Sequence, residues 1–227
     1  MTALPEIVLV GGGGHCRSLI EVVEASGAYR VAGIVDVAAH RNRTTLGYPW
    51  LGEDADLPDL IRRYPAFLVA VGQLGMPALR ERLFRLLDAR GAPLITLRAP
   101  TATLSRHAVL GKGTVLFHQA CVNAGARIGV NAIINTAALV EHDAEVGDHC
   151  HISTGARVNG GCRIGARCFV GSGAVLREGV RLAEGSVVGA GAVVVHDTKP
   201  YGAYVGVPAR RVREIVPPAP PDLSVTS

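Results

Sequence analysis

The sequence predicts two structural units in series, a small α/β domain followed by a parallel β-helix of hexapeptide repeats. Short apolar runs alternate with helical patterns over residues 1–100. From Leu104 onward, a branched aliphatic residue stands at every sixth position, sixteen times without a break. Aromatic residues make up only 4% of the 227 residues, whereas glycine reaches 28, so we expect a core of small aliphatic side chains rather than aromatic rings.

The first unit is expected to begin with a strand at residues 7–10, a turn of four glycines at 11–14 and a helix. The apolar residues of that helix follow at helical spacing and are Leu19, Ile20, Val22 and Val23. The same patterns predict strands at 31–36 and 67–71, helices at 57–63 and 79–90, and a last apolar stretch at 93–97. Because strands that alternate with helices pack as a parallel sheet, we predict a small α/β domain over residues 1–100.

Two positions of each hexad are constrained in the predicted β-helix. The aliphatic position runs from Leu104 to Val194, and the residue four places later is small or short and β-branched in every hexad. This pairing is typical of a parallel β-helix with three short faces per coil, in which each aliphatic stacks on the one 18 residues later. Glycine often follows the aliphatic, as at Gly129, Gly147 and Gly165, and we expect these glycines to adopt corner conformations that a Cβ would resist.

Charge and cysteine content narrow the class of protein. The net charge is +4 without a long basic run, which suits anionic small molecules and gives no reason to expect nucleic acid as a partner. The five cysteines form no Cys-x-x-Cys pair and lie mostly at small positions of the repeat, so we expect reduced core thiols. No apolar run reaches the roughly 18 residues that span a bilayer, and no secretion signal is evident at the start. We therefore expect a soluble, cytoplasmic protein with no membrane partner.

One polar group interrupts the otherwise apolar repeat, the triplet Glu141, His142 and Asp143. A histidine has a pKa near neutrality and two ring nitrogens, which suit a general base, and an adjacent carboxylate can orient the ring and stabilise the imidazolium. An exposed surface triplet without a catalytic role is the alternative. Spacing alone does not choose between the two.

The hexads, together with Asn135-Thr136, the triplet and His151, resemble the bacterial nucleotide-sugar (amino-sugar) N-acetyltransferases of the left-handed β-helix hexapeptide acyltransferase superfamily, of the bacillosamine, perosamine and sialic-acid O-acetyltransferase-like types. The resemblance implies a left-handed coil, which periodicity cannot assign because parallel crossovers are normally right-handed. It also implies a Rossmann-like sheet in the first unit and a homotrimer that binds acetyl-CoA between neighbouring β-helices. Residues 101–213 would be the acetyltransferase domain with a closing segment, and residues 214–227 a disordered tail.

The resemblance also implies roles for single residues. His142 would remove a proton from the sugar amine, and Asp143, which stands where relatives often have Glu, would raise the basicity of His142. Asn135 would bind substrate in the same pocket. The backbone N–H of Gly160 would stabilise the oxyanion. The candidates for binding acetyl-CoA are His151, Gly160, Ser172 and Ala190.

A second candidate site lies in the first unit, where the glycine-rich turn follows a strand and opens a helix. Backbone N–H groups and the helix dipole can approach a phosphate there. The dinucleotide fingerprint is incomplete because Cys16 takes the place of its last glycine, which argues against NAD. The resemblance implies that this turn holds the nucleotide sugar and that Asp36 meets the nucleoside, the alternative for Asp36 being a helix cap. The substrate-binding candidates here are Gly12, Gly13, Gly14, His15 and Asp36.

Two further segments carry weaker signals. Gly72-Gln73 stands where relatives have a Gly-Asn pair, so a substrate contact there does not transfer directly. Near the end, a basic cluster suits a solvated surface better than contacts to CoA phosphates. The cluster consists of Arg210, Arg211 and Arg213.

These features predict an acetyl-CoA-dependent enzyme that acetylates the amino group of a nucleotide-linked amino-deoxysugar for surface polysaccharide or glycoprotein, with acetyl-CoA as co-substrate and no metal. Three alternatives stay open. They are an O-acetyltransferase for a sialic-acid-type sugar, a non-catalytic binding or scaffold β-helix, and a zinc-dependent hydratase that uses His142, His149 and His151. The sequence leaves open the nucleotide base (UDP, dTDP or GDP), the sugar and the acceptor carbon.

Overall fold

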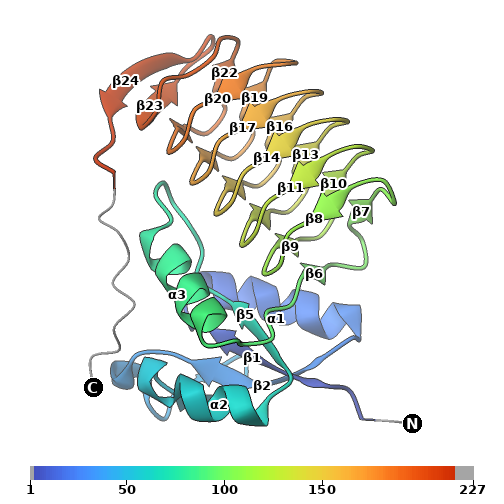
Figure 1. Cartoon of the computed structure of the whole chain (residues 1–227), viewed down its shortest axis with the longest axis vertical. Helices are drawn as coiled ribbons and strands as arrows, with labels where there is room; N and C mark the ends of the chain where they lie inside the picture. The colour runs from blue at the N-terminus through green and yellow to red at the C-terminus, as the bar shows by residue number, and fades with distance from the viewer. Residues whose placement is uncertain (1–2, 218–227) are drawn as a thin grey trace. The chain divides into compact units, whose positions relative to one another are not determined.

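The computed structural model describes residues 3–217 and divides them into two compact units. Unit 1 contains residues 3–72 and 78–100, and unit 2 contains residues 73–77 and 101–217. In Figure 1 the chain runs from blue in unit 1 to red at the end of unit 2. Within the described residues, no helix is both long and apolar enough to cross a membrane.

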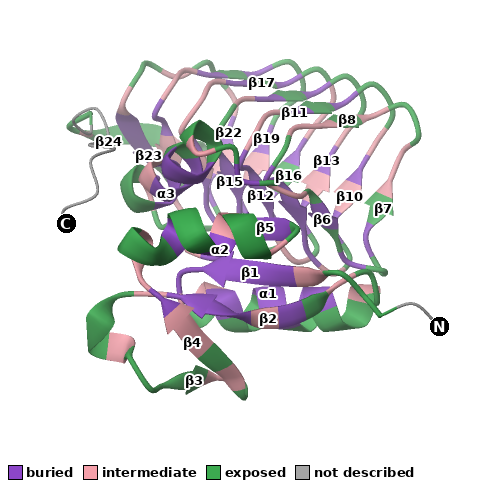
Figure 2. Ribbon diagram, turned by 60° about the horizontal axis from the view of Figure 1, so that its bottom comes forward, coloured by how far each residue is buried: buried purple, intermediate pink, exposed green. Residues whose placement is uncertain are grey.

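Unit 1 is a mainly parallel sheet with helices, as predicted. The strand order is β3-β4-β2-β1-β5, and β1 pairs in parallel with both β2 and β5. Strand β1 has a partner on each edge, and its residues Ile7, Val8 and Leu9 are fully buried, as expected for a central strand of a parallel sheet whose faces are covered (Figure 2). The elements are β1 (Glu6–Val10), α1 (Gly14–Ser26), β2 (Arg30–Val35), a 3₁₀ turn (Ala38–His40), β3 (Thr44–Thr45), β4 (Tyr48–Gly52), a 3₁₀ turn (Asp54–Asp56), α2 (Leu57–Arg63), β5 (Ala66–Val69), α3 (Ala78–Ala89) and β6 (Leu97–Arg98).

The sequence patterns missed the hairpin formed by β3 and β4. These strands pair antiparallel across a turn in which Leu46 and Gly47 both have positive φ, and β4 also pairs in parallel with β2. The first strand has only two residues, and the second contains Pro49 and ends at Gly52, residues that argue against a strand. The stretch expected at 93–97 forms a single bridge from Leu94 to Phe67, followed by β6.

Unit 2 is the parallel β-helix that the hexads predicted, with the left hand that the family resemblance implied. Within the described residues it contains sixteen two-residue strands, each of which ends at a predicted aliphatic position. In chain order these strands are β7 (Thr103–Leu104), β8 (Val109–Leu110), β9 (Val115–Leu116), β10 (Cys121–Val122), β11 (Arg127–Ile128), β12 (Ile133–Ile134), β13 (Leu139–Val140), β14 (Glu145–Val146), β15 (His151–Ile152), β16 (Arg157–Val158), β17 (Arg163–Ile164), β18 (Phe169–Val170), β19 (Val175–Leu176), β20 (Arg181–Leu182), β21 (Val187–Val188) and β22 (Val193–Val194).

The coils stack in the predicted register of 18 residues. Val122 lies opposite Val140, which in turn lies opposite Val158. The stacking gives three sheets, one through β7, β10, β13, β16, β19 and β22, one through β8, β11, β14, β17 and β20, and one through β9, β12, β15, β18 and β21. The small position is buried as well, so Ala138 and Cys150 have no exposed surface. All five cysteines are free thiols, and four of them are buried, as expected for core residues.

The β-helix is closed by an added hairpin. Strand β23 (Gly202–Val205) continues the third sheet beside β21, and β24 (Arg210–Glu214) pairs antiparallel with β23. Every residue of β24 is exposed, which agrees with a solvated basic cluster there. The predicted disordered tail begins at Glu214, which ends β24, and its residues 218–227 lie outside the described part of the chain.

The expected role of the glycines that follow the aliphatic residues is wrong. The corner residue with positive φ is the third after the aliphatic, as at Gly155 (φ 65°) and Asp143 (φ 58°). Gly147 and Gly165 are needed for a different reason. A Cβ on Gly165 would lie 2.7 Å from the backbone nitrogen of Glu184 in the next coil, so these glycines allow close stacking of the coils.

We therefore predict that Gly165→Ala lowers the free energy of unfolding by about 3 kcal/mol, because backbone atoms must move apart. The matched control is Gly155→Ala, which meets no atom within 4 Å and should cost only about 1 kcal/mol for the left-handed conformation. Urea unfolding of both variants checks this. An equal loss in the two variants would contradict the assignment.

Candidate active site

The triplet lies on the corner of the coil between β13 and β14. The Nδ1 atom of His142 is 3.0 Å from Oδ2 of Asp143. An ionised carboxylate can only accept, so Nδ1 carries the proton and Nε2 keeps a free lone pair. Asp143 occupies the left-handed corner position, which aspartate tolerates better than most residues. The structure thus brings the two predicted catalytic residues together with Nε2 in the form that a base requires.

The hydrogen bond that His142 donates to Asp143 raises the pKa of His142 above the ordinary value of 6.5. Desolvation of the ring opposes this shift, whereas the negative charges of Asp143 and Glu141 add to it, so the net direction is upward. Both side chains are well exposed, 67% for His142 and 75% for Asp143, so their ion pair adds little to stability. The pair therefore affects the chemistry of the ring more than the fold.

Gly160 lies next to the imidazole, one coil after His142. A Cβ at this position would be 2.7 Å from both Cε1 and Nε2 of His142, so the missing side chain provides the space for the ring. The carbonyl of Gly160 accepts a hydrogen bond from Gly179, whereas its N–H makes no hydrogen bond within the described residues. An N–H without a partner beside Nε2 fits the predicted oxyanion role, which stays a prediction.

A second carboxylate belongs to the same corner. Oε2 of Glu141 accepts a hydrogen bond from Nδ2 of Asn123 at 2.8 Å and one from the backbone N–H of His142 at 3.2 Å. Sequence reasoning missed Asn123, although the 18-residue register places it directly beneath Glu141.

The other β-helix candidates lie on a different corner, which follows the sheet of β12, β15, β18 and β21. Nδ2 of Asn135 donates to Nε2 of His151 at 3.0 Å, and Nδ1 of His151 donates to the carbonyl of Gln73 at 2.8 Å. His151 is only 4% exposed. Because both of its ring nitrogens are engaged within the chain, a direct contact with acetyl-CoA would have to break one of these bonds.

Ser172 and Ala190 are exposed on that second corner, after β18 and β21. The hydroxyl of Ser172 is 3.0 Å from that of Ser153. A single β-helix therefore groups Asn135 with Ser172 and Ala190 but keeps them on a different corner from His142.

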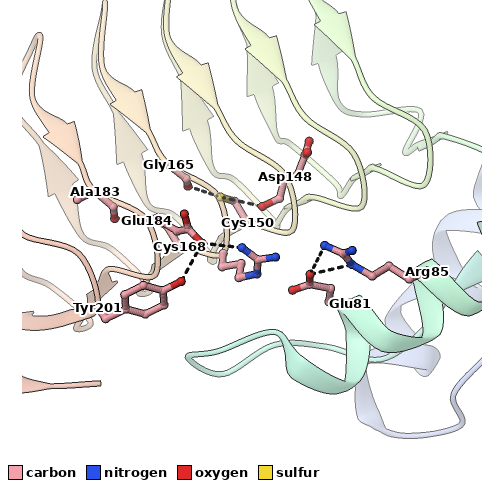
Figure 3. A network of polar contacts seen from close by, with 10 residues as sticks. Glu81, Arg85, Asp148, Cys150, Gly165, Cys168, Ala183, Glu184 and Tyr201 are labelled. Atoms are coloured by element: carbon pink, nitrogen blue, oxygen red, sulfur yellow. Dashed lines mark hydrogen bonds and ion pairs between the residues drawn. The ribbon is translucent and has the colours of Figure 1, made fainter. Parts of the chain in front are cut away.

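The third corner, after β14, β17 and β20, carries polar contacts that complete the coil. Nδ2 of Asn131 donates to Nδ1 of the buried His149 at 3.0 Å. Glu184 accepts from the hydroxyl of Tyr201 and pairs with Arg167 (Figure 3). These contacts hold neighbouring coils together.

The three histidines of the zinc alternative lie apart on the coil. His142 is on the corner after β13, His149 on the corner after β14, and His151 begins β15. Between residues 3 and 217, no group of three or more His, Cys, Asp and Glu side chains is arranged to hold a metal ion.

In unit 1 the structure brings Gly12 and Asp36 together at the carboxyl end of the sheet. A Cβ on Gly12 would lie 2.4 Å from Oδ2 of Asp36, so glycine is required there. His40 fixes the side chain of Asp36, because its Nδ1 lies 2.6 Å from Oδ2 of Asp36. The backbone carbonyl of Asp36 accepts a hydrogen bond from Nε1 of Trp50 at 3.0 Å. A pocket opens here, and its polar lining includes Arg17, Asp36, His40 and Arg43.

Two glycines of the turn, Gly13 and Gly14, are exposed. Gly13 caps α1, which begins at Gly14, and a Cβ on either would meet nothing within 4 Å. His15 follows in the first turn and packs near Gly72. The sequence did not indicate His40, Arg43 or Trp50, because they belong to the hairpin region whose pattern is irregular.

Comparison with known proteins adds two family matches. Residues 6–87 match the PglD N-terminal domain, and residues 161–196 match the bacterial transferase hexapeptide family (six repeats).

Solved structures match nearly the whole chain. A histidine-to-asparagine variant of perosamine N-acetyltransferase from Caulobacter crescentus, in complex with CoA and GDP-perosamine, is 37% identical with a TM-score of 0.87, over 93% of this chain and 99% of that one. The acetyltransferase domain of PglB from Neisseria gonorrhoeae FA1090, in complex with acetyl coenzyme A, is 32% identical with a TM-score of 0.86, over 92% and 100%.

The match to a curated protein is shorter. UDP-N-acetylbacillosamine N-acetyltransferase from Bacillus subtilis (strain 168) is 32% identical over 117 residues. This is 50% of the present chain, which spans about half (51%) of the length of that protein.

The hydrogen bond between His142 and Asp143 predicts a measurable shift. In Asp143→Asn the pKa of His142 should fall toward 6.5, because the neutral amide no longer stabilises the imidazolium. An NMR titration of the ring signals measures it, with Asp148→Asn on the neighbouring corner as the control. An unchanged pKa in Asp143→Asn would rule out this contact as the cause.

Proposed function

We propose, from the premise that this chain belongs to the family of bacterial nucleotide-sugar N-acetyltransferases with a left-handed β-helix, that it transfers acetyl from acetyl-CoA to the amino group of a nucleotide-linked amino-deoxysugar. The observation that carries the proposal is the His142–Asp143 pair, in which Nδ1 is bound to the carboxylate and the ring packs beside Gly160. A binding or scaffold protein would have no need of this arrangement.

The reaction follows from these groups. The sugar nitrogen attacks the thioester carbonyl while Nε2 of His142 takes its proton, and Asp143 stabilises the imidazolium that forms. The backbone N–H of Gly160 donates to the oxyanion. When the intermediate collapses, the C–S bond breaks, and the proton held by His142 passes to the departing thiolate. Protonation of His142 from solvent removes the base, so the rate falls as the pH drops through its raised pKa.

The acceptor is held through unit 1. Arg17 and Arg43 line the pocket beside the amino end of α1, where two guanidinium groups and the positive end of the helix dipole suit a diphosphate. Asp36, fixed by His40, supplies an acceptor for the nucleoside. This assignment keeps Gly12, Gly13, Gly14 and His15 as substrate contacts.

The donor site needs more than one chain. The acetyl-CoA candidates Ser172 and Ala190 lie on a different corner from His142 and Gly160, and so does the substrate candidate Asn135, so one β-helix does not bring all of these residues together. The sheet between the two corners points half-buried apolar side chains outward, including those of Leu139 and Val175, which suits contact with a second copy. We therefore assign a homotrimer with acetyl-CoA between neighbouring helices. We propose a cytoplasmic location for the enzyme, because its co-substrate acetyl-CoA must be available to it.

Thiol release from acetyl-CoA tests the function directly. The purified protein is assayed with UDP-, dTDP- and GDP-linked 3-amino and 4-amino deoxysugars, and with free sialic acid. Rapid release with one amino sugar supports the proposal and identifies the acceptor. Release with sialic acid alone would replace it by the O-acetyltransferase alternative, and no release with any acceptor would count against both.

We expect His142→Ala to lower kcat by about 10²- to 10⁴-fold, because the general base is lost. His107→Ala serves as the control, since His107 is an exposed histidine on the corner after β7. Steady-state kinetics with the best acceptor gives the result. Unchanged turnover in His142→Ala would remove His142 from the mechanism.

Arg17→Ala should raise the KM for the nucleotide sugar by about 10- to 100-fold, which corresponds to one lost charge-assisted hydrogen bond. The KM for acetyl-CoA should stay the same, because the donor is bound elsewhere. Arg62→Ala on the exposed surface of α2 is the matched control. An equal rise in both KM values would show that Arg17 does not act on the acceptor.

A further inference from the structure

The corner that carries His142 has little side-chain support of its own. His142 and Asp143 are both mostly exposed, and an exposed ion pair holds its geometry weakly. A general base that rotates away into solvent loses most of the rate acceleration it provides, because a displacement of about 1 Å can lower the rate by a factor of about 10². Another part of the structure must therefore hold this corner.

From the coil before, Asn123 reaches the corner through Glu141. The 2.8 Å bond from Nδ2 of Asn123 ties the Glu141 carboxylate to the preceding coil, and the same oxygen accepts the backbone N–H of His142. Glu141 and Asn123 are both half-buried, so water competes less for this bond than for a fully exposed one. The thiol of Cys121 lies 3.5 Å from Oδ1 of Asn123, which leaves Nδ2 directed at Glu141.

From the coil after, the backbone and Gly160 complete the support. The N–H of Gly161 donates to the carbonyl of His142 at 3.0 Å, and the imidazole packs over Gly160. On the preceding coil, the N–H of Asp143 is bound by the carbonyl of Ala124 at 3.1 Å. Backbone bonds of this kind recur in every coil. Among the described corners that follow β10, β13 and β16, only the corner of His142 has a side-chain link such as the one between Asn123 and Glu141.

We infer that Glu141, held by Asn123, is a positioning residue for His142 and keeps Nε2 of the imidazole beside Gly160 instead of free in solvent. The inference rests on the proposed function in one respect only, that His142 is the base whose orientation sets the rate. Neither Glu141 nor Asn123 needs to touch a substrate for this role.

The effect of ring position on the rate can be separated from the effect of nearby charge on the pKa of His142, because few charged groups surround the ring. Asp143 and Glu141 are the charged groups on the corner of His142. The preceding coil presents Asn123, Ala124 and Gly125, and the following coil presents Asn159, Gly160 and Gly161, all uncharged. Asn123→Ala therefore removes the anchor and keeps every charge, whereas Glu141→Gln removes a charge and keeps a hydrogen-bond acceptor.

For Asn123→Ala we expect kcat to fall by about 10- to 100-fold, with both KM values nearly unchanged and the pKa of His142 close to that of the native protein. Glu141→Gln should lower the pKa of His142, moving the acid limb of the rate profile to lower pH, with a smaller loss of kcat. Glu145→Gln, an exposed carboxylate that begins β14, should match the native protein in rate and pKa. Thermal melting confirms that each variant is folded.

An NMR experiment without substrate makes the outcome independent of the proposed function. Nuclear Overhauser contacts between the His142 ring and the α-protons of Gly160 should be present in the native protein and weakened in Asn123→Ala. Persistence of these contacts, or a native kcat in Asn123→Ala, would overturn the positioning role. If His142→Ala proves fully active, the proposed base is wrong, and the ring contacts alone still decide whether Asn123 and Glu141 position the histidine.

Discussion

The parallel hydrogen bonding of each strand to the strand 18 residues later is the interaction on which the rest of unit 2 depends. It sets Val122 opposite Val140 and Val140 opposite Val158, so every position of the hexad becomes a column along the helix. Inside, the columns hold aliphatic and small residues with almost no exposed surface. Where the coils approach most closely, glycine is required, because a Cβ would meet the backbone of the next coil.

The same register builds the chemistry. Residues whose numbers differ by 18 become neighbours on successive coils, as Asn123 and Glu141 do, and as His142 and Gly160 do. A repeat of this kind has little core to deform, so a polar site can be installed by changing a few outward residues of successive coils. The left-handed corner position, filled by glycine in many coils, carries Asp143 here and orients the imidazole.

The geometry of a triangular coil also limits what one chain can do. Three corners point in different directions. Of the acetyl-CoA candidates, Ser172 and Ala190 share one corner, whereas Gly160 lies on the corner of His142. Two copies side by side can face different corners toward one another, which is the physical reason to place the donor between chains. Unit 1 supplies a separate pocket that contains the carboxylate of Asp36. His40 holds this carboxylate, and Gly12 leaves the space that it occupies.

The sequence by itself determined the β-helix, its strands and its buried columns, because a period of six with two constrained positions leaves one regular solution. It also singled out His142 and Asp143 as candidates, because they are adjacent in the chain, and their catalytic roles stay a prediction. Only the tertiary structure decided that Gly147 and Gly165 serve close stacking, that Asn123 meets Glu141, and that His151 is buried between Asn135 and Gln73. It alone showed the β3–β4 hairpin, whose short strands, proline and glycines give no strand pattern. These features depend on which atoms lie across a coil or a sheet, and a linear pattern does not contain that information.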